Sequence, residues 1–154
     1  MSDAETSRQM REDWDRRARD DARYYVAFGR RRQAAAEFFA SAEEALHAIR
    51  FELRRFPPAV DPRTLSALEI GCGPGRLLVP LSRVLGRIVG VDVSPEMVVQ
   101  ARQNLEGIDN ASVETTSGAD LAAFQDESFD FCYSYAVFQH IPDKAAVWSY
   151  LREA

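Results

Sequence analysis

The stretch Leu68-Glu69-Ile70-Gly71-Cys72-Gly73-Pro74-Gly75, followed by Ile88-Val89-Gly90-Val91-Asp92, decides the fold of this 154-residue chain. The two segments have the composition of buried β-strands, and they are separated by a glycine turn and the length of one helix. Asp92 ends the second strand, about 20 residues after the turn begins. This order predicts half of a nucleotide-binding βαβ unit, in which a carboxylate at that position meets ribose hydroxyls.

The glycine turn limits the kind of ligand. Gly71 is expected to let the backbone reverse as it leaves the strand, and Gly73 to let a ligand approach the main chain. The spacing is G-x-G-x-G, with Arg76 where a dinucleotide fingerprint has its third glycine. An NAD-type oxidoreductase is therefore an alternative that fits the turn less well.

The run from Leu68 to Gly75, together with Asp92-Val93-Ser94-Pro95-Glu96-Met97, resembles the first two motifs of the class I S-adenosylmethionine-dependent methyltransferases. The resemblance implies an α/β fold with a Rossmann-like, doubly wound parallel sheet in the order 3-2-1-4. It implies S-adenosyl-L-methionine as the cofactor and a small-molecule methyl acceptor as the partner. A full domain of the family continues past the fourth strand. We therefore expect an incomplete sheet, either in a C-terminally truncated chain or with that edge covered by a second copy, another chain or the N-terminal helices.

The same resemblance assigns residues to the cofactor. Glu69 is implied to organise the glycine loop and the methionine end, and Asp120 to accept a hydrogen bond from the adenine amino group. Tyr135 is implied to lie beside the methionine part. The implied cofactor-binding residues are Glu69, Gly71, Cys72, Gly73, Asp92, Val93, Met97, Asp120, Leu121 and Tyr135.

These assignments have structural alternatives. Glu69 could be exposed at a sheet edge, Asp120 could cap a short helix, and Val93 and Met97 could be core residues. Cys72 and Cys132 both fall in segments expected to be buried, where a free cysteine acts as a small apolar residue.

His140 is the candidate catalytic residue. The resemblance places it near the acceptor side, and an imidazole can act as a general base because it changes charge near neutral pH. A purely structural histidine is the alternative. With only two histidines in the chain and no paired ligand spacing, we expect no metal site.

Hydrophobic spacing predicts the remaining elements. Amphipathic helices are expected at residues 8–26 and 33–56, and by analogy with the family they could bring Trp14, Tyr24 and Tyr25 to the acceptor pocket. Further helices are expected at residues 75–85, 94–107 and 144–154, and strands at residues 65–70, 87–92, 111–116 and 129–135. We divide the chain into an N-terminal helical cap, residues 1–60, and a partial Rossmann-like cofactor-binding domain, residues 61–154.

Composition restricts the class of protein. Hydrophobic residues make up 46% and charged residues 28% of the chain, which is typical of a globular domain. The net charge of −5 argues against nucleic-acid binding, which depends on surplus Lys and Arg. No signal peptide or membrane-length apolar run is visible, so we expect a cytoplasmic protein without a membrane partner. A module that binds the cofactor without turnover, or a subunit that completes its sheet with another chain, remains open.

Overall fold

A parallel four-stranded sheet in the order β3-β2-β1-β4 forms the centre of the computed structural model, which describes residues 3–154. The α/β Rossmann-like fold class and the order 3-2-1-4 predicted from the sequence are confirmed. The carboxyl ends of the strands meet at one edge because all the strands run the same way. The strands are β1 (Ser66–Ile70), β2 (Arg87–Asp92), β3 (Ala111–Thr115) and β4 (Phe131–Ser134).

The two central strands are apolar because both of their faces are covered. In β1, Ala67 faces one hydrophobic cluster, and Leu68 and Ile70 face the other. Leu68 is paired with Val89 of β2 and Cys132 of β4. The edge strand β4 is half-buried along its length.

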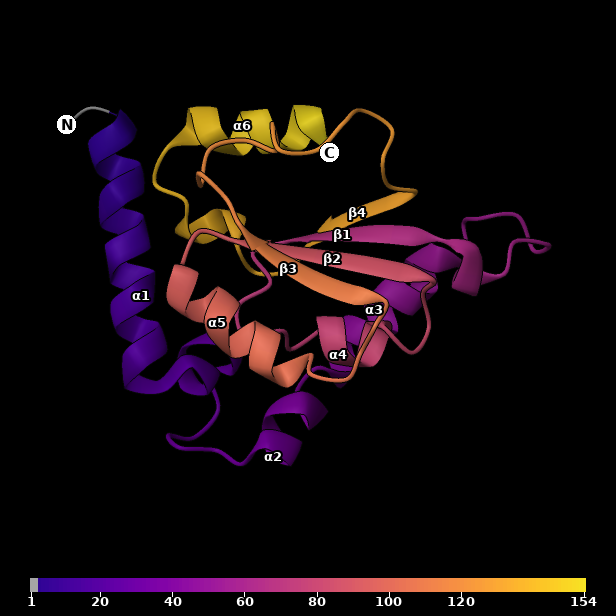
Figure 1. Cartoon of the computed structure of the whole chain (residues 1–154), viewed down its shortest axis with the longest axis horizontal. Helices are drawn as coiled ribbons and strands as arrows, with labels where there is room; N and C mark the ends of the chain where they lie inside the picture. Colours follow the sequence, from indigo (N-terminus) through magenta and orange to yellow (C-terminus); the bar gives the residue numbers. More distant parts are fainter. Residues whose placement is uncertain (1–2) are drawn as a thin grey trace.

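Helices cover both faces of the sheet (Figure 1). The larger cluster joins one face to α3 (Glu43–Leu53), α4 (Leu78–Leu81) and α5 (Pro95–Asn104). The smaller cluster joins the opposite face to α6 (Lys144–Glu153) through Tyr150. Helix α3 thus shares one core with the sheet. The division of the chain near residue 60 stays a prediction.

Helix α1 (Asp3–Ala27) stands to one side of these layers and packs against α5 (Figure 1). The helix predicted at residues 8–26 is confirmed. It is interrupted at Asp21, whose backbone is not helical (φ −168°, ψ 82°). Asp21 Oδ1 accepts a hydrogen bond from the Tyr24 amide at 3.2 Å, so its side chain caps the segment that follows.

The single helix predicted at residues 33–56 is wrong. The structure has two helices there, α2 (Ala35–Ala40) and α3, with a turn between them. The Ser41 hydroxyl donates to the Phe38 carbonyl at 2.6 Å, and the Ser41 carbonyl accepts from Arg76 at 3.0 Å. The turn is thus fixed by a local serine bond and by a residue distant in sequence.

The helix predicted at residues 75–85 is shorter than expected, since only α4 is helical and residues 73–77 form turns. Pro80 explains part of this difference because it has no N–H to donate to the Arg76 carbonyl. The other predicted helices and strands agree with the structure to within a few residues. Short 3₁₀ turns lie at Pro62–Thr64 and Phe138–His140. Within residues 3–154, every helix is too short or too polar to cross a membrane.

Candidate functional site

A cavity of about 380 Å³ opens where the four strands end, with α1 forming one of its walls. Thr116 and Gly118 follow β3, Asp92 ends β2, and residues 69–73 end β1 and form its turn; residues 135–137 follow β4. The lining therefore crosses the sheet in strand order. Its volume is in the range of small-molecule sites, which in open α/β sheets lie at this edge.

Asp92 joins the glycine turn to the start of α5. Its carboxylate accepts hydrogen bonds from the backbone N–H of Gly73 at 2.8 Å and of Ser94 at 2.9 Å. Burial raises the pKa of Asp92 to about 6, and these backbone bonds oppose the rise. Because a carboxylate has about four acceptor positions, Asp92 can accept from two further hydroxyls, as a ribose diol requires.

The glycine turn allows two other segments to approach closely. Gly71 and Gly73 have φ values of +76° and +53°, in the left-handed region. A Cβ on Gly71 would lie 2.5 Å from Val137 Cγ2, and one on Gly73 would lie 3.1 Å from Val26 Cγ2. Glycine is therefore required for the chain after β4 and the end of α1 to close on this turn.

Glu69 is buried at the end of β1, so the alternative of an exposed edge residue is wrong. Its side chain is 3% exposed, and the Tyr133 hydroxyl donates to Oε2 at 2.9 Å. Burial raises the pKa of Glu69 to about 8, although Tyr133 and the charge of Arg76 act in the opposite direction. The Glu69 carboxyl is thus mainly protonated at neutral pH.

The raised pKa of Glu69 predicts a specific pH dependence of stability. The unfolded chain releases this proton near the ordinary glutamate pKa of 4.5, whereas the native state keeps it up to about 8. The native state therefore binds more protons in this interval, and the free energy of unfolding should fall as pH rises, by up to about 1.4 kcal/mol per pH unit. Asp92 adds to this fall at the lower end of the window.

Urea unfolding of the wild type and Glu69→Gln between about pH 5 and 8 measures this dependence. Glutamine can still accept from Tyr133 but cannot ionise, so its curve should be flatter above about pH 6. Glu114→Gln on β3 is the control, because Glu114 is exposed. Equal slopes for the wild type and Glu69→Gln would contradict the assignment.

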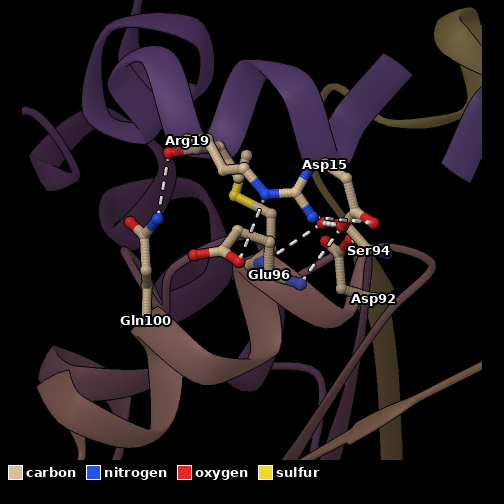
Figure 2. A network of polar contacts seen from close by, with 8 residues as sticks. Asp15, Arg19, Asp92, Ser94, Glu96 and Gln100 are labelled. Carbon is tan, nitrogen blue, oxygen red and sulfur yellow. Dashed lines mark hydrogen bonds and ion pairs between the residues drawn. The ribbon is translucent and has the colours of Figure 1, made fainter. Parts of the chain in front are cut away.

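Helix α1 is docked on the N-terminus of α5 by a polar network (Figure 2). Asp15 Oδ1 accepts from the Ser94 hydroxyl at 2.5 Å and from the Glu96 backbone N–H at 3.1 Å. Ser94, which is fully buried, in turn accepts from the Met97 N–H at 3.1 Å. Gln100 on α5 donates to the Ala18 carbonyl at 2.9 Å. A carboxylate from α1 thus satisfies the free end of α5 two residues after Asp92.

Most of the residues predicted from the sequence line one cavity. They are Glu69, Gly71, Cys72, Gly73, Asp92, Val93, Met97, Tyr135 and His140. Met97 and Cys72 are also core residues, at 1% and 2% exposure, and their contact with the cofactor stays a prediction.

Asp120 and Leu121 are not brought to this cavity. Asp120 Oδ1 accepts from the Ala122 N–H at 3.2 Å, and the Leu121 N–H donates to Glu153 Oε2 of α6 at 2.6 Å. Leu121 is buried in the cluster between the sheet and α6. The contact of these two residues with adenine stays a prediction.

The N-terminal aromatic residues behave differently from one another. Trp14 and Tyr25 line the cavity, whereas Tyr24 is not among its lining residues. The Trp14 ring packs edge-on against His140, with ring centroids 5.5 Å apart. Arg76 lines the cavity and Asp15 holds the start of α5 beside it, and neither role was predicted from the sequence. Asp15 is one of many charges on an amphipathic helix, but Arg76, a charge inside an apolar run, was a signal that could have been used.

Comparison with known proteins assigns the family. The model of the "Methyltransferase domain" family matches residues 68–154, more than half of the chain. The chain belongs to this family of methyltransferase domains. The class I methyltransferase resemblance of the glycine turn and of the segment around Asp92 is thereby confirmed.

This methyltransferase domain is similar in sequence to curated proteins and similar in fold to solved structures. The ubiquinone biosynthesis O-methyltransferase of Xanthomonas axonopodis pv. citri is 31% identical over 107 residues, which are 68% of this chain and 45% of that protein. The chain thus spans about half the length of the curated relatives it matches. Magnesium protoporphyrin IX methyltransferase from Synechocystis, solved with SAM, has a TM-score of 0.66 at 20% identity, over 92% of this chain and 66% of that one. Phosphoethanolamine N-methyltransferase 1 of Haemonchus contortus, solved with phosphoethanolamine and S-adenosylhomocysteine, has a TM-score of 0.71 at 15% identity, over 99% and 30%.

Proposed function

We propose that this domain binds S-adenosylmethionine in the cavity at the strand ends and directs transfer of its methyl group to a small-molecule acceptor. The observation that carries the proposal is Asp92. Its half-buried carboxylate is held by two backbone N–H groups at the end of β2, and it can still accept from the two hydroxyls of a ribose. Apolar residues of the cavity wall, Met10 of α1 and Val93 after β2 among them, suit the adenine ring.

The bound cofactor would supply the electrophile, a methyl group on a sulfonium, which an acceptor would attack in line, with S-adenosylhomocysteine as the leaving group. The residues of this chain contribute binding, alignment and exclusion of water. His140 lies in the cavity wall against Trp14 and is our candidate for the group that removes a proton from the acceptor. A hydroxyl acceptor is consistent with the O-methyltransferases among the relatives. The net charge of −5 argues against nucleic acid and is consistent with a small-molecule acceptor.

Calorimetric titration with S-adenosylhomocysteine and with NADH tests the cofactor. We expect saturable binding of S-adenosylhomocysteine with a micromolar Kd, which corresponds to a binding free energy of about −8 kcal/mol. We expect no binding of NADH. Tight binding of NADH alone would favour the oxidoreductase alternative instead.

Turnover is tested by formation of S-adenosylhomocysteine from S-adenosylmethionine with a panel of small phenols and amines. His140→Gln is expected to lower kcat by about a hundredfold while the Kd for S-adenosylhomocysteine stays unchanged. Cofactor binding without any turnover would favour a binding module or a subunit that works with another chain. The cytoplasmic location and a second copy covering the β4 edge stay predictions from the sequence.

A further inference from the structure

Arg76 places a buried guanidinium in the wall of the cavity. The residue is 9% exposed and lies beside Glu69 and Tyr135 in the lining. Nη1 donates to the Ser41 carbonyl at 3.0 Å, and the guanidinium carbon is 5.5 Å from the centroid of the Tyr135 ring. Among the residues that the structure describes, none accepts a hydrogen bond from the buried Nε–H.

The positive charge of Arg76 lacks an anionic partner within residues 3–154, where the ion pairs within 4.0 Å all involve other residues. Glu69 acts on Arg76 through its charge, but its pKa of about 8 leaves it mainly neutral at pH 7. Glu44 also lines the cavity and is exposed to solvent. Because a buried guanidinium without a paired anion is costly, this wall is complementary to an anionic group of a ligand.

The order of the strands gives the position of that group along a bound cofactor. Asp92, at the end of β2, marks the ribose, and Gly118, after β3, lies on the adenine side. On the other side of β2 come β1, with Glu69, and then β4, with Tyr135. A chain that leaves the ribose away from the adenine therefore crosses the glycine turn and ends beside Arg76.

We propose that Arg76 binds the α-carboxylate at the amino-acid end of S-adenosylmethionine and S-adenosylhomocysteine. This inference rests on the proposed function. The Ser41 carbonyl accepts from Nη1, which leaves Nη2 to donate to an oxygen of a carboxylate in the cavity. The Ser41 bond and the Tyr135 ring hold the guanidinium plane in place, so little side-chain freedom is lost on binding.

Affinities for two ligands test the role of Arg76. One is S-adenosylhomocysteine, and the other is its decarboxylated analogue, which keeps the adenosine, the thioether and the amine. Titration calorimetry of the wild type should show a preference for S-adenosylhomocysteine of about tenfold to a hundredfold, the range expected for a charge-assisted pair. Arg76→Gln should lose this preference, with its affinity for the analogue changed by less than about threefold.

Two further variants control the experiment. Arg76→Lys keeps the charge but not the planar fork, so it should restore only part of the preference. Arg83→Gln removes an exposed arginine seven positions later and should leave both affinities unchanged. Circular dichroism checks that each variant folds. If Arg76→Gln does not fold, the ratio of the two affinities in Arg76→Lys tests the assignment, and a ratio equal to that of the wild type overturns it.

The other outcomes separate the inference from the proposed function. If the wild type binds S-adenosylhomocysteine and Arg76→Gln binds it equally well, the guanidinium serves a different carboxylate, such as one on the acceptor, and the inference is wrong while the function stands. An equal loss for both ligands means a structural role for Arg76 and also overturns the inference. If the folded wild type binds neither ligand, the proposed function fails together with it.

Discussion

Asp92→Asn is expected to weaken the binding of S-adenosylhomocysteine by at least about a hundredfold, or about 2.7 kcal/mol. An asparagine oxygen can accept from the Gly73 or the Ser94 N–H but not from both, because the amide nitrogen is itself a donor. The variant also removes the charge that strengthens bonds from ribose hydroxyls. Two hydroxyl contacts to a charged acceptor, at about 1.5 kcal/mol each or more, account for the expected loss.

Titration calorimetry measures this effect, with Asp109→Asn as the control because Asp109 is exposed and outside the cavity. The pH dependence gives a second readout. Since the pKa of Asp92 is about 6 in the free protein, affinity in the wild type should rise as pH increases through this value, and Asp92→Asn should lack that rise. Binding by Asp92→Asn within about threefold of the wild type would show that the ribose is held elsewhere.

Removing the Asp15 carboxylate is expected to undock α1 and to lower the free energy of unfolding by about 2–3 kcal/mol. In Asp15→Ala the buried Ser94 hydroxyl loses its acceptor, and so does the Glu96 N–H at the start of α5. A backbone N–H at a helix N-terminus and a buried hydroxyl, each left without its acceptor, cost about 1 kcal/mol or more apiece. The apolar cluster of Ala18, Ala22 and Met97, with Trp14 and Val26 packed against it, offers neither group a new hydrogen-bond acceptor.

Asp13→Ala is a matched control for Asp15→Ala. Both are aspartates on α1, but the ion pairs of Asp13 within residues 3–154 are with Arg16 and Arg17 of the same helix. Such partly exposed pairs are each worth less than about 1 kcal/mol. Urea unfolding gives the stabilities, and hydrogen exchange shows whether the α1 amides lose protection in Asp15→Ala and keep it in Asp13→Ala.

The docking of α1 also affects ligand release. Met10, Trp14 and Val26 of α1 form part of the cavity wall. Movement of α1 away from the sheet would therefore widen the path by which a bound cofactor leaves. Dissociation of S-adenosylhomocysteine from Asp15→Ala should therefore be faster, by about tenfold if undocking limits release in the wild type. Equal stabilities and equal dissociation rates for the two aspartate variants would mean that α1 is held by its apolar contacts alone.

The sequence predicted the parts of the fold that depend on neighbouring residues. The strands at residues 66–70 and 87–92, and the N-cap at Ser94, follow from short apolar runs and from local capping chemistry. The glycine turn fixes the βαβ geometry, which places Asp92 beside Gly73 whatever the rest of the chain does. The same spacing predicted the ribose carboxylate, whereas the strand order was implied by the resemblance to the class I methyltransferases.

Only the tertiary structure decided which distant residues complete the site. Asp15 meets Ser94 across 79 positions of sequence, and Arg76 meets Ser41 across 35. Contacts of this kind depend on how α1 and the turn before α3 pack on the sheet, and no local pattern records that packing. Leu121 is the opposite case, because α6 holds its N–H through Glu153 and draws it away from the cavity. Local spacing thus determined the cofactor-binding edge of the sheet, whereas long-range packing determined what closes over it.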